Sequence, residues 1–174
     1  MTDKIAINHV TNANIYIDGF SLLGRAEELE LPQVKHKMTE HKALGMVGTA
    51  EFFSGVEKMT CKVKWASFYP EVLRKAANPF KTVQLQARSS LETYTGQGRV
   101  AEVPVVVLLT AAHNDFPLGS YKQHERGTPE SNLSVYYAKM EIDGNHIFEF
   151  DVLNNIYKVA GEDVLTTYRL NIGA

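Results

Sequence analysis

Six histidines are the side chains that would most readily bind a metal ion, and their spacing argues against a metal site. They are His9, His36, His41, His113, His124 and His146. None belongs to an H-x-H or H-x-x-x-H pair, the spacings that turn two ring nitrogens toward one ion. Cys61 is the single cysteine, so a zinc cluster lacks thiolates and an intrachain disulfide is impossible. We therefore expect no metal and no other cofactor.

The segment from Gly96 to Ala101 matches the dinucleotide-binding pattern G-x-G-x-x-A. That pattern works only where a helix begins, because the N-terminus of the helix receives the pyrophosphate. Here a β-prone run containing Pro104 follows. The glycines therefore favour a hairpin turn between two strands over a cofactor site.

Catalytic groups have equally little support. Ser21 lacks the second glycine of a G-x-S-x-G nucleophile elbow, and a Ser-His-Asp triad from distant positions has nothing in its favour. Glu149 and Asp151 share one face of a predicted strand and could act as acid and base. A solvated sheet face or an ion pair between subunits is the favoured interpretation of that pair. Cys61 alternates with apolar residues, which indicates a buried thiol. We predict that the protein is not an enzyme and has no catalytic residues.

The composition describes one folded domain over residues 1–174. The chain has a mass of 19.5 kDa, 44% hydrophobic and 22% charged residues, and a net charge of -2. These values rule out a disordered chain and argue against tight nucleic-acid binding, which needs clustered lysine and arginine. No apolar signal segment is visible at the start, and the apolar run Val103–Ala112 is too short to span a bilayer. We expect synthesis in a reducing cytoplasm and no stable membrane insertion.

Charge is divided unevenly along the chain. Residues 1–90 carry a balance of +3, whereas residues 91–174 carry a balance of -5. Such a division would suit head-to-tail contacts between copies of the chain, although ordinary variation of surface residues explains it equally well.

Alternation of apolar and polar residues predicts a mainly β fold. The clearest strand spans residues 57–66, where Met59, Cys61, Val63 and Trp65 face one way and lysines face the other. Similar patterns predict strands at residues 14–18, 20–31, 34–39, 82–91, 103–109, 132–142 and 147–150. The dipeptides Asp18-Gly19 and Asp143-Gly144 predict hairpin turns. Pro104 is expected near the start of a strand or at a sheet edge.

Two short helices complete the predicted elements. Residues 70–77 open with Pro70 and stop before Pro79, and residues 163–172 end at Gly173. Turn-rich segments predict loops at 41–48 and about 114–131, and a polar N-terminal arm covers about residues 1–12. A sheet of this size has more edge than one domain covers, which is a first indication of assembly.

An ordered set of short patterns resembles one known family. The N-terminal part contains Ile15-Tyr-Ile-Asp-Gly19, Leu31-Pro32 and Gly45-Met-Val-Gly48. The C-terminal quarter contains Met140-x-Ile-Asp-Gly144, then Glu149-x-Asp-x-x-Asn-x-Ile-x-Lys-Val159, and ends with Arg169-x-Asn-Ile-Gly173. In this order and length, the chain resembles the major tail tube protein of contractile-tailed bacteriophages, a type also used in R-type tailocins.

The resemblance implies a structural virion protein. Subunits with a β-sandwich or barrel-like fold would form hexameric rings that stack into a hollow tube inside a contractile sheath. Strands from each subunit would complete a ring-wide inner barrel. The tube would conduct DNA, with only transient and non-specific contact, or pierce a membrane. The implied partners are further copies of the chain and the sheath, baseplate hub, tape measure and tail terminator proteins of a virion tail or tailocin particle.

Two sets of residues are predicted to matter in such a tube. The polar face of the strand at 82–91 supplies the lumen-facing residues Thr82, Gln84, Gln86, Arg88 and Ser90. The loop at 41–48 supplies contacts between rings through Ala43, Leu44, Gly45, Met46, Val47 and Gly48, together with the N-terminal arm and the long loop at about 114–131. Both glycines of this loop are expected to adopt backbone angles that valine cannot.

Two other classes of protein stay open. A secretion-system tube of the Hcp kind would share the fold and ring symmetry but lacks this C-terminal pattern. A small-ligand-binding β-barrel would line a cavity with the apolar run Val103–Leu109. A strictly monomeric protein with a bound apolar molecule would favour the second class.

Overall fold

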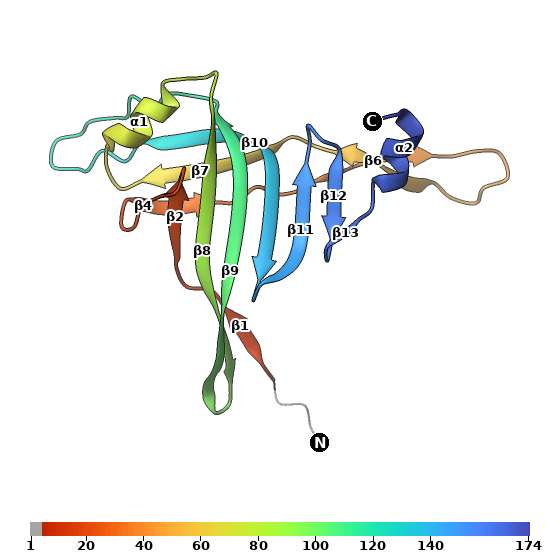
Figure 1. Ribbon diagram of the computed structural model, residues 1–174, viewed down its shortest axis with the longest axis horizontal. Helices are drawn as coiled ribbons and strands as arrows, with labels where there is room; N and C mark the ends of the chain where they lie inside the picture. Colours follow the sequence, from red (N-terminus) through yellow and green to blue (C-terminus); the bar gives the residue numbers. More distant parts are fainter. Residues whose placement is uncertain (1–4) are drawn as a thin grey trace.

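The computed structural model describes residues 5–174, which form a mainly β structure with two short helices (Figure 1). In chain order the elements are β1 (Ile7–His9), β2 (Ala13–Ile17), β3 (Phe20–Ser21), β4 (Ala26–Glu30), β5 (His36–His41), β6 (Ala50–Val56), β7 (Met59–Trp65), α1 (Pro70–Ala76), β8 (Thr82–Thr95), β9 (Gly98–His113), β10 (Glu130–Ile142), β11 (Asn145–Asp151), β12 (Ile156–Val159), β13 (Glu162–Asp163) and α2 (Thr166–Ile172). The predicted mainly β class is confirmed.

The strands form two crossing layers that share β10. One layer runs in the order β13-β12-β11-β10-β9-β8-β2-β3, and β7 pairs with β10 and β4 to form the other layer. The first part of β10, residues 130–135, pairs with β7, whereas residues 137–142 pair with β11. The register against β9 shifts between Val135 and Tyr137, where the strand bends. Figure 1 shows β4 and β7 running across the long β8–β9 hairpin.

The core lies between these layers. The predicted apolar face of β7 is confirmed, because Met59, Cys61, Val63 and Trp65 are all buried. They pack into one cluster with the inward residues of β8, β9, β10 and β2, which include Val83, Leu85, Val107, Leu109, Leu133, Val135, Ile15 and Ile17. The lysines of β7 face outward, where Lys62 pairs with Glu130 at 2.8 Å and Lys64 with Glu27 at 3.3 Å.

Both predicted Asp-Gly turns are confirmed. Asp18 and Gly19 have φ values of 49° and 83°, and Asp143 and Gly144 have values of 53° and 73°. Two successive positive φ angles are typical of the type I′ turn, whose twist suits a two-residue hairpin. The glycines near residue 97 likewise form the turn of the β8–β9 hairpin, where Thr95 pairs with Gly98. No helix follows that turn, so the dinucleotide pattern is a turn, as expected.

Three sequence-based expectations about strands need correction. The strand predicted at 20–31 is broken into β3 and β4, because a turn with Gly24 at a φ of 74° carries the chain from one layer to the other. The strand predicted at 34–39 corresponds to β5, but all its residues are exposed, since it pairs with β6 in a separate two-stranded sheet. Pro104 lies inside β9 rather than near its start. Its carbonyl accepts the amide of Asp143, just beyond the last residue of β10, so the missing N–H of Pro104 is on the side of β9 where β10 ends and where no ladder bond is needed.

The two helices differ in how they are held. Helix α1 begins at Pro70 and buries Val72 and Ala76 against the core. Helix α2 ends at Gly173 in the left-handed conformation, as predicted, yet it contains no buried residue. Its apolar side chains Tyr168, Leu170 and Ile172 are exposed. The described part of the N-terminal arm contains β1, which pairs with the far end of β8, and residues 1–4 lie outside the described residues.

Candidate assembly surfaces

The side chains with catalytic potential are engaged in structural contacts. Glu149 lies on β11; its Oε2 accepts hydrogen bonds from Lys158 at 3.1 Å and from the ring of His146 at 3.0 Å, and its Oε1 accepts one from Tyr137 at 3.2 Å. Partial burial alone would raise the pKa of Glu149, but these three bonds outweigh it and lower that pKa. Glu149 is thus a fixed, charged group held by neighbours, which suits an ion-paired sheet face.

Asp151, the second carboxylate of the considered acid–base pair, has a different partner set. One of its oxygens accepts the backbone amides of Leu153 and Asn154, both at 3.0 Å. A side chain that caps the following backbone amides shapes a turn. The two carboxylates therefore have separate structural roles, and their common strand face is not an acid–base site.

Cys61 is a core residue. Its side chain is buried, and burial raises the pKa of the thiol to about 12, with a smaller contribution from Glu30. A thiol with such a pKa stays protonated at neutral pH and is not a nucleophile. The prediction of a buried, inert cysteine agrees with this environment.

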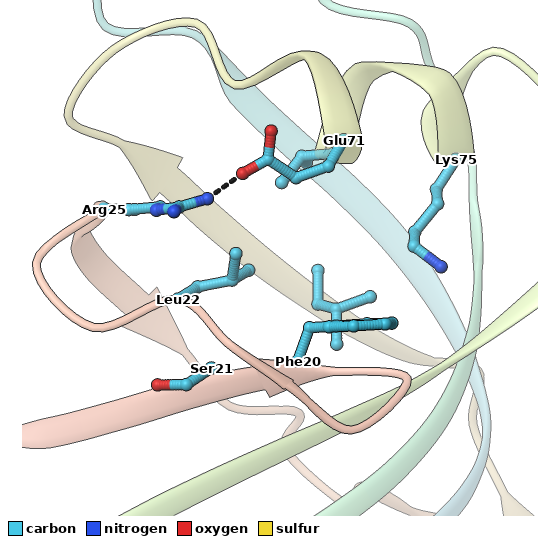
Figure 2. A pocket seen from close by; sticks show the side chains of 8 residues that line it. Phe20, Ser21, Leu22, Arg25, Glu71 and Lys75 are labelled. Carbon is cyan, nitrogen blue, oxygen red and sulfur yellow. Dashed lines mark ion pairs between the residues drawn. The ribbon is translucent and has the colours of Figure 1, made fainter.

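The pocket in Figure 2 lies between α1 and the turn that follows β3 and has a volume of about 360 Å³. Its apolar part includes Ile17, Leu22 and Val72, and Figure 2 shows Arg25 and Glu71 paired across its entrance. Lys75 at the other side is paired with Asp18. Since these charged groups already neutralise one another, the pocket presents neither an unpaired base nor an unpaired amine for chemistry.

Metal ligands and membrane spans are also missing from residues 5–174. No group of three or more His, Cys, Asp or Glu side chains in this part of the chain could hold a metal ion. Neither helix is long and apolar enough to cross a bilayer. The remaining candidates for a functional site are exposed surfaces.

The first such surface is the outer face of β8 and its neighbours. Thr82, Gln84, Gln86, Arg88 and Ser90 all lie on this face, opposite the buried Val83, Leu85 and Ala87, and each of the five is exposed or half-buried. The face continues across β9 and β10, because Gln86 pairs with Leu108 and Leu108 pairs with Lys139. It continues onto β11 through the pairing of Lys139 with Glu149. We call this surface the outer sheet face.

Basic groups on the outer sheet face are largely neutralised. Lys139 lies 2.7 Å from Glu141, and Lys158 lies 3.1 Å from Glu149. Near the tip of the β8–β9 hairpin, Arg99 contacts Glu92 at 3.0 Å and Glu102 at 3.4 Å. Arg88 is placed over the ring of Tyr16 instead. The face thus mixes both signs of charge with neutral polar groups and a few apolar ones.

The second surface is the tip of the β5–β6 hairpin, residues 42–49. It begins with a turn in which the amide of Met46 donates to the carbonyl of Ala43. Gly45 has a φ of 89°, as expected for a glycine that permits an otherwise strained angle. Gly48 does not have a positive φ, so the same expectation is wrong for Gly48. Leu44 and Val47 are as exposed as in an extended chain.

Sequence reasoning missed several other exposed apolar side chains. Phe52 and Phe53 on β6 are exposed, as are Val164 and Leu170 near the C-terminus. Their residue types are those of a protein core, so only the structure shows that residues 5–174 leave them exposed. Clustered exposed apolar residues are typical of interaction sites. These exposed apolar side chains are therefore candidates for contact with other molecules.

The fold matches tube components of contractile injection machines. A tube–sheath chain from the extended state of the extracellular contractile injection system PVC superimposes with a TM-score of 0.57 at 8% identity, over 74% of this chain and 87% of that one. A chain of the sheath/tube terminator of the same system gives a TM-score of 0.56 at 8% identity, over 74% of this chain and 92% of that one. At such low identity the similarity defines the class of fold.

Sequence comparison then assigns the family. Residues 7–173 match the family of phage tail tube protein FII, and the chain belongs to this family. It is 29% identical to the tail tube protein of Escherichia phage P2 over 166 residues, which covers 92% of this chain and 94% of that protein. The chain is thus a structural tail tube protein of the contractile type and not an enzyme, and the family resemblance read from its sequence patterns is confirmed.

Proposed function

We propose that the chain forms the inner tube of a contractile phage tail or tailocin as hexameric rings stacked into a hollow conduit. The observation that carries this proposal is the amount of apolar surface and free strand edge on a single subunit. Strands β5 and β6 pair only with each other among the described strands, and their hairpin exposes Met38, Phe52 and Phe53. A two-stranded sheet is marginal in water unless something packs against it, and neighbouring subunits provide that contact.

The outer sheet face lines the lumen in this proposal, with Thr82, Gln84, Gln86, Arg88 and Ser90 exposed to the channel. DNA binds proteins mainly through lysine and arginine that neutralise its phosphates. The ion pairs Lys139–Glu141 and Lys158–Glu149 remove two such cations from the face. DNA then passes along a wall of neutral and compensated groups without being retained, and contact stays transient and non-specific.

The opposite side of the ring faces the sheath protein. The exposed residues of α2 and the surface of α1 are the contacts available for it, and the ends of the tube meet the baseplate hub and the tail terminator. A tape measure protein fills the lumen before DNA does. The tube is made in the host bacterial cytoplasm and resides in the virion tail or tailocin particle.

Electron microscopy of the purified chain tests the proposal. At high concentration we expect rings with a central hole and stacks of such rings in negative stain. Deletion of Ala43–Val47 should leave rings but abolish long stacks, because the tip of the β5–β6 hairpin carries the contact between rings. A chain that stays monomeric at all concentrations would contradict the proposed tube, whereas long tubes from the deletion variant would contradict the role of the tip.

A further inference from the structure

The tip of the β5–β6 hairpin has no apolar surroundings in its own subunit. Leu44 and Val47 are fully exposed, and Met46 is 44% exposed. Lys42 precedes them and makes no ion pair with any residue from 5 to 174. The tip therefore presents three apolar side chains next to one positive charge, which is a composition that suits insertion into an apolar, acid-rimmed groove.

Such a groove lies beside β2 and β4, away from the tip of the β5–β6 hairpin (Figure 1). It has a volume of about 460 Å³ and lies where β4 leaves part of the main sheet uncovered. Its floor includes Ile15, Val105, Val107 and Met140, and its rim carries the carboxylates of Glu27 and Glu28. We call it the β4 groove. The apolar run of β9, which the sequence linked to a ligand cavity, supplies two of these floor residues.

We infer that the tip of one subunit inserts into the β4 groove of a second copy of the chain, in the neighbouring ring. This inference rests on the proposed tube and names the surface that receives the hairpin. Figure 1 shows the β5–β6 hairpin extending past α2, on the side away from β2 and β4. A tip so placed reaches a groove in another subunit, not its own. One end of each subunit then binds the opposite end of the next, a contact that repeats along a tube.

Charge favours the pairing of these two surfaces. Glu27 is already bound to Lys64 at 3.3 Å, whereas Glu28 makes no ion pair within the described part of the chain. Lys42 and Glu28 are thus a free cation next to the apolar tip and a free anion next to the apolar groove. In the contact they neutralise each other while Leu44, Met46 and Val47 lie over the floor of the groove.

A charge exchange tests this contact. We expect Lys42→Glu and Glu28→Lys each to raise the concentration needed for tube formation about tenfold, because weak ion pairs are multiplied across every ring boundary. The double variant should restore polymerisation to near the original concentration. Tube formation is measured by sedimentation at several protein concentrations. Two single variants that polymerise normally, or a double variant no better than either one, would overturn the inference.

A mixing experiment is sharper, because a head-to-tail contact needs one tip and one groove. Val47→Asp disables the tip and leaves the groove intact, while Ala13→Arg fills the groove and leaves the tip intact; Ala13 is exposed and lines the groove. Neither variant should form tubes alone. Their mixture should form pairs of rings and nothing longer, as seen by electron microscopy. Phe80→Asp, which changes an exposed apolar residue between α1 and β8, is the matched control and should polymerise normally.

These outcomes separate the inference from the proposed tube. If the original chain forms no tubes, the tube proposal fails. If the original chain forms tubes and folded Ala13→Arg also forms them, the β4 groove is not the receiving surface. Circular dichroism establishes that each variant is folded. A small apolar molecule that native mass spectrometry finds bound to the original chain, and absent from Ala13→Arg, would assign the groove to a ligand and overturn the inference.

Discussion

Trp65 donates its indole N–H to the hydroxyl oxygen of Ser131 at 2.9 Å, and both side chains are buried. The bond joins the end of β7 to the start of β10, two strands that pair there, so it fixes β7 on the strand that both layers share. Ser131→Ala should lower the free energy of unfolding by about 1–3 kcal/mol, because the indole N–H would lose its acceptor inside the core. Urea denaturation of the purified chain measures this change. Ser120→Ala in an exposed loop is the control and should shift stability by no more than about 0.5 kcal/mol.

The two glycines of the hairpin tip should respond differently to valine. Gly45 has a φ of 89°, and a left-handed backbone costs a residue with a side chain about 1–2 kcal/mol. Gly45→Val should therefore raise the concentration needed for tube formation and leave the amount of folded, soluble subunit unchanged. Gly48→Val keeps an ordinary backbone and serves as its comparison. Sedimentation and circular dichroism on both variants give the result, and equal losses of folded subunit and of tubes would contradict it.

Placing lysines on the outer sheet face should convert an inert wall into a DNA-binding one. In Gln84→Lys/Gln86→Lys each subunit gains two cations on the predicted lumen surface. Tubes of this variant should retain short duplex DNA at low salt and release it as salt rises, since counterion release drives such binding. Co-sedimentation of labelled DNA with tubes measures the effect. Thr166→Lys/Thr167→Lys is the control, because it adds the same charge on exposed α2. Any DNA that its tubes bind should lie outside them and should not be protected from nuclease.

Stability should fall in mild acid because of His113. This side chain is buried, neither ring nitrogen has a hydrogen-bond partner within residues 5–174, and burial lowers its pKa below 6.5 despite the opposing charge of Asp115. A lowered pKa means that the unfolded chain binds the proton more readily. The free energy of unfolding that depends on a neutral His113 is thus fully present above pH 6.5. It is lost as the pH falls through the lowered pKa.

His113→Leu should flatten the pH dependence of unfolding between pH 7.5 and pH 5. Urea midpoints at these two pH values measure it. His124→Asn, in an exposed loop where asparagine tolerates the positive φ of 64°, should keep the acid sensitivity of the original chain. An unchanged slope in His113→Leu would show that other groups set the acid response.

Polymerisation should weaken at high salt if the charge division along the chain serves head-to-tail contact. Residues 1–90 carry +3 and residues 91–174 carry -5. Raising ionic strength from about 0.1 M to 1 M shortens the screening length from about 10 Å to 3 Å, which removes attraction between exposed patches. The concentration needed for tubes, measured by light scattering, should then rise. Polymerisation that is indifferent to salt would assign the division to chance.

The sequence predicted most reliably the elements whose local pattern and tertiary environment agree. Strand β7 alternates cleanly and has one buried face, and the Asp18-Gly19 turn has the backbone angles that its residues favour. The break after β3 was missed, because Gly24 turns the chain toward a layer that only long-range pairing creates. The Ala160-Gly161 turn was missed for a related reason, since alanine at a φ of 49° follows from the pairing of Val159 with Glu162 and not from its own preference.

The candidate surfaces were predicted less completely than the fold. The polar face of β8 follows directly from alternation, and the structure places all five of its predicted residues on one exposed face. The β4 groove has no sequence signal, because its floor residues come from β2, β9 and β10 and its rim comes from β4. Alternation also cannot tell whether an apolar side chain such as Phe53 faces its own core or a neighbouring subunit.

Strand β10 bears on how a conduit made of such subunits responds to force. It crosses from one layer to the other without interruption over residues 130–142, hydrogen-bonded to β7 at one end and to β11 at the other. Tension applied along such a strand must shear a row of bonds together, whereas a hairpin can be peeled open one bond at a time. A compressive load on one layer therefore reaches the other as displacement of the whole subunit. In the proposed tube, we therefore expect thrust along the axis to pass from subunit to subunit with little bending inside any of them.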